Sequence, residues 1–373
     1  MTDKVGIYIH VPFCRSKCYY CDFCSRTRAD DEIKSLYTKR LCAEIADVAK
    51  AIEGTRKVAD TVYFGGGTPT LLSPSQLETI LETVERNFGI SDGAEITCET
   101  NPKTGDGKML WDMRSIGINR LSIGMQSVHD NELRALGRIH SFADFQNVFS
   151  DARDAGFDNI SADLMYGIPE QTPKSFAESL RTIKSLSPEH ISSYSLTVEE
   201  GTPFWNRREK LVLPDEDKVS DMYLMMSEML SDGGYKKYEI SNFAHESKES
   251  RHNLKYWRRE DYLGFGPAAH SFFGDVRSAH SRDIEGYLRG ENIIESSEKI
   301  IGDEAMDEYV MLGMRLSDGI DIKKFEQIFK VDFFERYGSV FSRFSPDYVY
   351  IDSESCRFTD RGMLVSNYIL SET

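Results

Sequence analysis

Four cysteines lie close together near the amino terminus, in the stretch HVPFCRSKCYYCDFCS that begins at His10. Cys14, Cys18 and Cys21 form a C-x3-C-x2-C pattern, and Cys24 follows three residues later. Thiolates are soft ligands, so three of them at this spacing can converge on one metal ion or cluster. A structural zinc site takes four protein ligands, and Cys24 or His10 offers the fourth. A [4Fe–4S] cluster held by three cysteines keeps one iron open to a ligand from outside the protein. The spacing favours the cluster and leaves zinc as the alternative.

Composition limits the setting in which these thiols work. No apolar run approaches the roughly 18 to 20 residues that span a membrane, and the start, MTDKVGIYIHVPF, does not resemble a secretory signal peptide. We therefore expect a cytoplasmic protein, in which clustered cysteines bind metal more often than they form disulfides. The formal charge is −16, from 61 acidic and 45 basic residues. This balance argues against a nucleic-acid partner, which requires a basic face.

An alternation of strands and helices must position the cysteines and the residues that work with them. Strand-like runs are predicted at 5–11, 61–66, 95–100, 120–127, 159–167 and 190–198. Amphipathic stretches between them predict helices at 30–54, 73–88 and 141–156. The last two open with serine, a good N-cap. Such alternation is typical of an α/β fold with a parallel sheet, and six strands indicate a barrel or partial barrel. Its chemistry is expected at the carboxyl ends of the strands.

The pattern changes after about residue 200. Residues 201–219 predict an irregular excursion, and the methionine-rich segment DMYLMMSEMLSDGG that follows predicts a helix whose methionines pack in the core. Helical patterns and a hairpin candidate, YVYIDSESCRFT, dominate the end of the chain. We expect two units, a core over 1–275 and a small, mainly helical domain over 280–373.

The cysteine region resembles a known family. YIHVPFCRSKCYYCDF is similar to the cluster loop of radical S-adenosylmethionine (SAM) enzymes, in the HemN/HemW branch. That branch has an aromatic residue six positions before the first cysteine, here Tyr8, and another just before the third, here Tyr20. Further similar segments follow in the same order: YFGGGTPTLL, CETNP, RLSIGMQS, LGRIHS, DLMYGIPEQT and YEISNFA. The resemblance covers nearly the whole chain and implies a partial (β/α)6 radical-SAM barrel with a small C-terminal domain.

The resemblance also implies the cofactors and their ligands. It implies a [4Fe–4S] cluster on Cys14, Cys18 and Cys21, with SAM at the open iron and an electron donor as a partner. SAM would then undergo reductive cleavage to a 5′-deoxyadenosyl radical, chemistry that the cofactor carries and the protein orients and shields. Whether this chain turns SAM over is left open, because the sequence does not show a substrate.

A glycine-rich turn follows the second predicted strand. Gly66, Gly67 and Thr68 allow close approach of backbone to a ligand, and the turn lacks the Lys-Ser/Thr ending of a P-loop. The resemblance implies that this turn binds the methionyl amino group of SAM. The alternative is a tight turn between a strand and a helix.

Charged and polar residues follow the later strands. The resemblance implies that they bind SAM, although isolated residues of these types are more often surface charges. It implies that Glu99 binds the ribose hydroxyls or an ammonium group, that Arg138 binds the carboxylate and that Asp163 binds the ribose hydroxyls. Gln126 and Thr197 would make further contacts with SAM.

The segment HNLKYW decides between two functions within the branch. It matches the HNxxYW motif of the HemW-type haem chaperones, which the oxygen-independent coproporphyrinogen III oxidase lacks. His252 offers an imidazole for haem iron, and Tyr256 and Trp257 offer flat apolar faces for a porphyrin. The alternative is a packed segment with a satisfied histidine. His270 is a weaker candidate for binding haem, or instead for lining the SAM pocket.

Two more features favour the chaperone. Phe23 stands where the oxidase has another cysteine, and only 13 residues precede Cys14, whereas the oxidase has a long extension there. We therefore expect a protein that binds haem and transfers it to recipient haemoproteins, membrane-associated ones included. Porphyrinogen decarboxylation is not expected. The oxidase and a radical SAM enzyme acting on another substrate are the alternatives.

Overall fold

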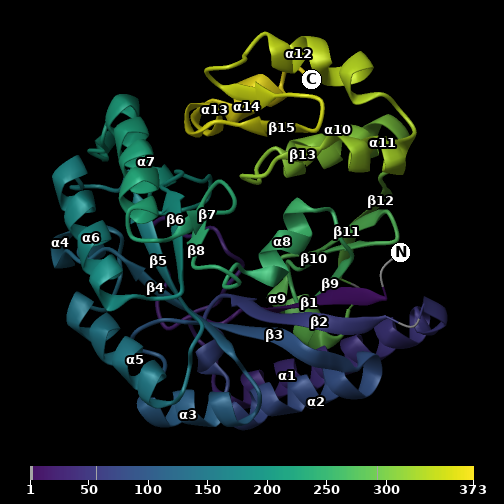
Figure 1. The fold of residues 1–373 in the computed structure, drawn as a ribbon. Coiled ribbons are helices and arrows are strands. Elements are labelled where there is room, and N and C mark those ends of the chain that lie inside the picture. The colour runs from purple at the N-terminus through teal and green to yellow at the C-terminus, as the bar shows by residue number, and fades with distance from the viewer. Residues whose placement is uncertain (1–2, 56, 292) are drawn as a thin grey trace.

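The computed structural model describes residues 3–55, 57–291 and 293–373. Six parallel strands cross the centre of the sheet in chain order, which confirms the predicted α/β core. They are β1 (Lys4–Val11), β2 (Val58–Gly66), β3 (Ile90–Thr100), β4 (Arg120–Gln126), β5 (Ile160–Tyr166) and β6 (His190–Ser195). The sheet curves into a partial barrel (Figure 1).

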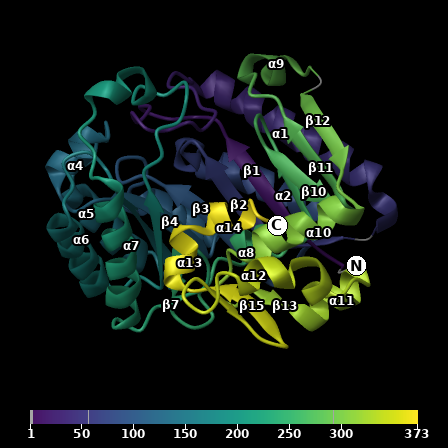
Figure 2. The ribbon, with the colours of Figure 1, turned by 90° about the horizontal axis from the view of Figure 1, so that it is seen from above.

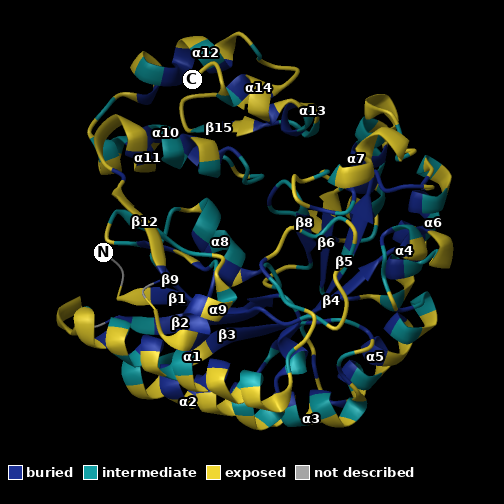
Figure 3. Ribbon diagram, turned by 180° about the vertical axis from the view of Figure 1, so that it is seen from behind, coloured by how far each residue is buried: buried dark blue, intermediate teal, exposed yellow. Residues whose placement is uncertain are grey.

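Helices connect these strands and cover the outer face of the sheet (Figures 1 and 3). Ser73 and Ser141 cap α2 and α5 with reciprocal capping boxes, as their sequences predict. The buried methionines Met222 and Met226 of α7 pack in the core. The helices of this part are α1 (Asp31–Ala51), α2 (Pro74–Phe88), α3 (Gly107–Ser115), α4 (Asp130–Ala135), α5 (Phe142–Asp154), α6 (Pro173–Leu186) and α7 (Glu216–Ser231), with short 3-10 turns at Glu53–Thr55, Pro69–Leu71 and Trp205–Lys210.

Further strands extend the sheet on both sides of the predicted six. The added elements are β7 (Lys236–Lys237), β8 (Asn242–Ala244), β9 (Tyr262–Phe265), β10 (His270–Phe273), β11 (Val276–His280) and β12 (Ile294–Lys299), with α8 (Arg251–Trp257) and α9 (Ile284–Arg289). Among the described residues, twelve strands form one sheet in the order β12-β11-β10-β9-β1-β2-β3-β4-β5-β6-β8-β7. β9 is parallel to β1, and β8 is antiparallel to β6. The boundary predicted between residues 275 and 280 therefore falls inside the sheet, which continues to Lys299.

The C-terminal unit begins at α10 (Gly302–Gly313) and is small and mainly helical. It contains β13 (Ile320–Asp321), α11 (Ile322–Phe329), a π-helical turn (Phe334–Gly338), α12 (Ser339–Ser342), β14 (Val349–Ile351), β15 (Ser355–Phe358), α13 (Asp360–Leu364) and α14 (Ser366–Leu370). Its strands form the sheet β13-β15-β14, which includes the predicted hairpin.

The C-terminal unit lies on the side of α8 and α7 (Figure 2). Charged contacts attach it to the barrel. Glu308 of α10 accepts hydrogen bonds from Arg259 at 2.7 Å and Arg277 at 2.6 Å, and Asp360 accepts from Ser227 at 2.7 Å and from Lys237. In the part of the chain that the structure describes, we find no helix with the length and apolarity needed to cross a bilayer.

Candidate functional site

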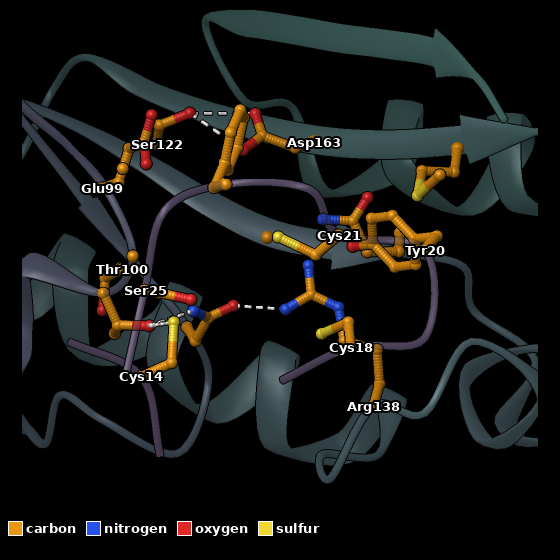
Figure 4. A pocket seen from close by; sticks show the side chains of 18 of the residues that line it. Cys14, Cys18, Tyr20, Cys21, Ser25, Glu99, Thr100, Ser122, Arg138 and Asp163 are labelled. Carbon is orange, nitrogen blue, oxygen red and sulfur yellow. Dashed lines mark hydrogen bonds between the residues drawn. The ribbon is translucent and has the colours of Figure 1, made fainter. Parts of the chain in front are cut away.

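The carboxyl ends of the parallel strands surround a cavity of about 380 Å³. Its walls come from the loop after β1, the turn after β2 and the ends of β3 to β6. Figure 4 shows the three thiols and Arg138 toward one end, with Glu99, Ser122 and Asp163 farther along. The placement agrees with the expectation that the chemistry of a parallel barrel gathers at this end of its strands.

Cys14, Cys18 and Cys21 all line this cavity as free thiols. Burial raises the pKa of Cys14, and it raises the pKa of Cys21 to about 11, so both thiols are protonated at neutral pH without a metal. Within the described ranges, no group of three His, Cys, Asp or Glu side chains is already gathered around one metal position. Each cysteine of a [4Fe–4S] cluster binds a different iron, so the three thiols need not meet at one position, but they must be deprotonated to bind.

The donor set fits a cluster with one open position better than a closed zinc site. Cys24 does not line the cavity, and its thiol donates to the carbonyl of Arg282 at 3.3 Å. His10 is also occupied, since its Nε2 donates to the carbonyl of Cys24 at 2.8 Å and its Nδ1 lies 3.2 Å from the Tyr8 hydroxyl. The two residues that could have supplied a fourth zinc ligand thus both have other partners, and His10 braces the cysteine loop through the Cys24 carbonyl.

A segment far along the chain holds the cysteine loop from outside. Arg282, between β11 and α9, donates to the carboxylate of Asp22 at 3.1 Å and to its carbonyl. Arg26 pairs with Glu285 of α9 at 2.6 Å. The strands added beyond β1 therefore help to position the loop that carries the thiols.

The glycine turn packs directly against the cysteine loop. The N–H groups of Gly67 and Thr68 donate to the carbonyls of Val11 and Phe13 at 2.8 and 2.6 Å. A Cβ on Gly67 would lie 2.5 Å from the Phe13 carbonyl oxygen, so this close approach requires glycine. Two backbone N–H groups of the turn are thereby already used. An ammonium group needs acceptors, and backbone carbonyls are of that type.

Two carboxyl groups line the cavity beyond the thiols. Glu99, at the end of β3, accepts a hydrogen bond from the Tyr63 hydroxyl at 2.9 Å, and burial raises its pKa to about 7. Asp163 on β5 accepts from Ser122 at 2.9 and 3.0 Å, and burial raises its pKa as well. Both groups are able to accept hydrogen bonds from ribose hydroxyls.

The other predicted SAM residues gather nearby. Arg138 donates to Asn101 at 2.6 Å and lies over the Tyr20 ring, and Gln126 lines the same wall with a positive φ of 67°. Thr197 lines the cavity at its exposed edge. Tyr8 is not among the lining residues and instead stacks on Tyr63, with ring centroids 6.1 Å apart.

The haem candidates of the HNLKYW segment, His252, Tyr256 and Trp257, do not line the cavity. His252, on α8, is fully buried, with Thr61 Oγ1 at 2.7 Å from its Nδ1 and the Tyr256 hydroxyl at 2.8 Å from its Nε2. Burial lowers its pKa to about 3. Both ring nitrogens have partners in this arrangement, which is the alternative of a packed segment with a satisfied histidine. Tyr256 and Trp257 are half-buried and also do not line the cavity.

Several lining residues were missed by sequence reasoning. Asn253 is the one residue of HNLKYW that lines the cavity, and His270 does not. Arg120 and Ser122 line it from β4, and Tyr194 from β6. The period of two along a strand could have indicated Ser122 and Arg120, which lie four and six residues before the predicted Gln126.

Comparisons with known proteins define the class first. The Radical SAM superfamily profile matches residues 8–183, and the HemN C-terminal domain profile matches 302–365. The structure of coproporphyrinogen III oxidase (HemN) from Escherichia coli superposes with a TM-score of 0.86 at 24% identity, covering 99% of this chain and 89% of that one. The protein has the radical SAM fold with a HemN-type C-terminal domain. Membership of that superfamily implies a [4Fe–4S] cluster and SAM.

Sequence relatives define the family more closely. The chain is 35% identical to heme chaperone HemW of Bacillus subtilis (strain 168), over 97% of both chains. It is 34% identical to heme chaperone HemW of Escherichia coli (strain K12), over 84% of this chain and 82% of that one. A mitochondrial radical SAM domain-containing protein of Danio rerio is 33% identical over 87% of this chain and 75% of its own length. The chain belongs to the HemW family.

Proposed function

We propose that this protein is a haem chaperone that binds haem, a [4Fe–4S] cluster and SAM, and transfers haem to recipient haemoproteins. The observation that carries the proposal is the identity of 35% to a heme chaperone over 97% of both chains. Such coverage includes the barrel, the added strands and the C-terminal unit. The resemblance therefore does not rest on the cysteine loop alone.

Cys14, Cys18 and Cys21 hold the cluster in this proposal, and the glycine turn with Arg138 orients SAM at its open iron. When bound, the cluster supplies one electron to the SAM sulfonium. The residues of this chain do the positioning. Arg138, fixed by Asn101, presents a guanidinium for a carboxylate, and Glu99 and Asp163 present acceptors for hydroxyl groups.

The HNLKYW segment has a structural role in this proposal. Its helix α8 packs against β2, and the backbone N–H groups of Arg251 and His252 donate to Glu95 of β3 at 3.0 and 3.1 Å. Lys255 pairs with Asp60 of β2 at 2.8 Å. The motif thus closes the barrel at the starts of its strands.

The test starts from anaerobic purification and cluster reconstitution of the full chain. Iron, sulfide and haem are quantified, and haem-loaded protein is mixed with an apo-haemoprotein to follow transfer by absorbance. We expect stoichiometric haem, transfer to the acceptor, and no protoporphyrinogen from coproporphyrinogen with reductant and excess SAM. Decarboxylation in that assay would replace the proposal with the oxidase function. Cleavage of SAM without any haem binding would favour an enzyme acting on another substrate.

A further inference from the structure

A buried hydroxyl connects the glycine turn to the first cysteine of the loop. Thr68 is 3% exposed, and its Oγ1 lies 3.8 Å from the Sγ of Cys14, which is within hydrogen-bonding distance for sulfur. The same oxygen lies 2.9 Å from the side-chain nitrogen of Asn101. A hydroxyl group has one proton and two lone pairs, so the neighbour that receives the proton decides what Thr68 does.

Arg138 fixes the direction of this proton. Its guanidinium lies 2.6 Å from the Oδ1 of Asn101, and a guanidinium group has donors only. The side-chain carbonyl of Asn101 must therefore face Arg138, which turns the NH2 group of Asn101 toward Thr68. Because an NH2 group donates, the Thr68 Oγ1 accepts from Asn101, and its own proton is free for the Cys14 sulfur.

The backbone holds the hydroxyl and the thiol next to each other. The N–H of Thr68 donates to the carbonyl of Phe13 at 2.6 Å, directly before Cys14 in the chain. The N–H of Cys14 itself donates to the carbonyl of Arg26 at 2.9 Å. The main chain around Cys14 is thus attached both to the turn and to the far side of the loop. The Cys14 sulfur is therefore expected to stay within reach of Thr68 when it binds iron.

We propose that the Thr68 hydroxyl, oriented by Asn101, donates a hydrogen bond to the Cys14 sulfur of the bound cluster and raises the reduction potential of that cluster. This inference rests on the proposed cluster on Cys14, Cys18 and Cys21, and it does not depend on haem. Reduction adds one negative charge to the cluster, and a donor directed at a ligand sulfur stabilises that charge. The hydrogen bond is buried, where it is electrostatically stronger than in water. Thr68 and Asn101 thereby make the cluster easier to reduce, in addition to any contact of the turn with SAM.

The experiment measures the midpoint potential of the cluster by a redox titration followed by electron paramagnetic resonance, on the full chain reconstituted anaerobically without SAM. Thr68→Val replaces the hydroxyl by a methyl group, and Thr68→Ser keeps the hydroxyl. Thr70→Val is the matched control, because Thr70 is 5% exposed on the same turn and its hydroxyl contacts those of Thr100 and Thr104 at 3.2 and 2.8 Å instead of a thiol. We expect the equilibrium constant for reduction to fall about tenfold in Thr68→Val, which lowers the potential by about 59 mV for one electron. Thr68→Ser and Thr70→Val should keep a potential close to that of wild type.

A second readout detects the hydrogen bond itself. In D2O, the reduced clusters of wild type and Thr68→Ser should show the magnetic coupling of an exchangeable deuteron that Thr68→Val lacks. A change in the shape of the loop alone would not remove this coupling. The same deuteron coupling in Thr68→Val as in wild type would therefore contradict the proposed donor.

Other outcomes overturn the inference in distinguishable ways. An unchanged potential in Thr68→Val, or an equal fall in Thr70→Val, shows that the Thr68 hydroxyl does not act on the sulfur. Ser25 is a second hydroxyl beside the Cys14 thiol (Figure 4), and a lower potential in Ser25→Ala alone assigns the hydrogen bond to Ser25. If Thr68→Val holds no cluster, Thr68→Ala repeats the measurement, and loss of the cluster from both assigns the hydroxyl to cluster assembly instead of to its potential. Failure of wild type to hold a [4Fe–4S] cluster refutes the ligand assignment on which this inference rests.

Discussion

Adding one methyl group at Gly66 should loosen the loop that carries the cysteines. Gly66 has a φ of +98°, and a Cβ there would lie 2.6 Å from the His10 ring. That ring is buried and holds the carbonyl of Cys24 through its Nε2 at 2.8 Å. The ring must therefore move, and the cysteine loop with it, although the added methyl group itself meets His10 and not the bound ligand.

The magnitude follows from two separable costs. A residue other than glycine at positive φ costs about 1–2 kcal/mol, and extra volume in a packed region adds about 1–3 kcal/mol. Gly117 provides the matched control, because its φ is +102° and a Cβ there would meet nothing within 4 Å. Gly117→Ala should cost only the free energy of the positive φ, whereas Gly66→Ala should also cost that of the extra volume. The two variants should therefore differ in stability by about 1–3 kcal/mol. The loss of backbone entropy from the unfolded chain is common to both and cancels.

The assay is chemical unfolding of the two variants and wild type under anaerobic conditions, with cluster absorbance recorded after reconstitution. We expect Gly66→Ala to unfold at lower denaturant than Gly117→Ala and to retain less cluster. Equal loss of stability in both variants, with equal cluster content, would refute the role assigned to the His10 contact.

Three further predictions concern the same site. Serine at any of the three cavity-lining cysteines should abolish the reconstituted cluster absorbance, whereas Cys24→Ser should retain most of it, because Cys24 faces the Arg282 carbonyl; equal loss in Cys24→Ser would contradict the ligand assignment. Arg282→Ala removes the contacts with Asp22, so the cluster should be lost to a chelator faster, as followed by absorbance. Burial raises the pKa of Glu99 from 4.5 to about 7, so the folded protein keeps a proton that the unfolded chain loses. Stability should therefore fall as pH rises from about 4.5 to 7, by on the order of 3 kcal/mol. Thermal unfolding should show that the stability of Glu99→Gln falls less steeply with pH than that of wild type. The same dependence of stability on pH in both proteins would contradict the raised pKa of Glu99.

Local patterns predicted much of this molecule. The six central strands lie where alternating runs predict them, and Ser73 and Ser141 cap helices as their positions indicate. Cys14, Cys18 and Cys21 are within eight residues of one another, so their common position on one cavity was readable from spacing. The predictions held because each depends on periodicity, capping or spacing within a short stretch of chain.

Other features were decided by contacts between residues distant in sequence. The spacing left Cys24 as one option for a fourth ligand in the zinc alternative, and the structure places its thiol against the carbonyl of Arg282, 258 residues away. The sequence left His252 open as an iron ligand or a satisfied histidine, and in the structure Thr61 and Tyr256 occupy both of its ring nitrogens. The sheet continues to Lys299 because later strands pair beside β1, which no local period indicates.

Arg120 shows most clearly what the sequence determined and what the tertiary structure decided. The sequence by itself determined that an arginine begins a strand, a position where a charged side chain is usually exposed to solvent. Only the tertiary structure decided that this strand lies between two others and that Arg120 faces the cavity together with Glu99 and Asp163. Whether a charge is paired depends on every element that packs around it. The sequence supplied the chemical groups of this site, and the closure of the barrel decided which of them remain free to bind a ligand.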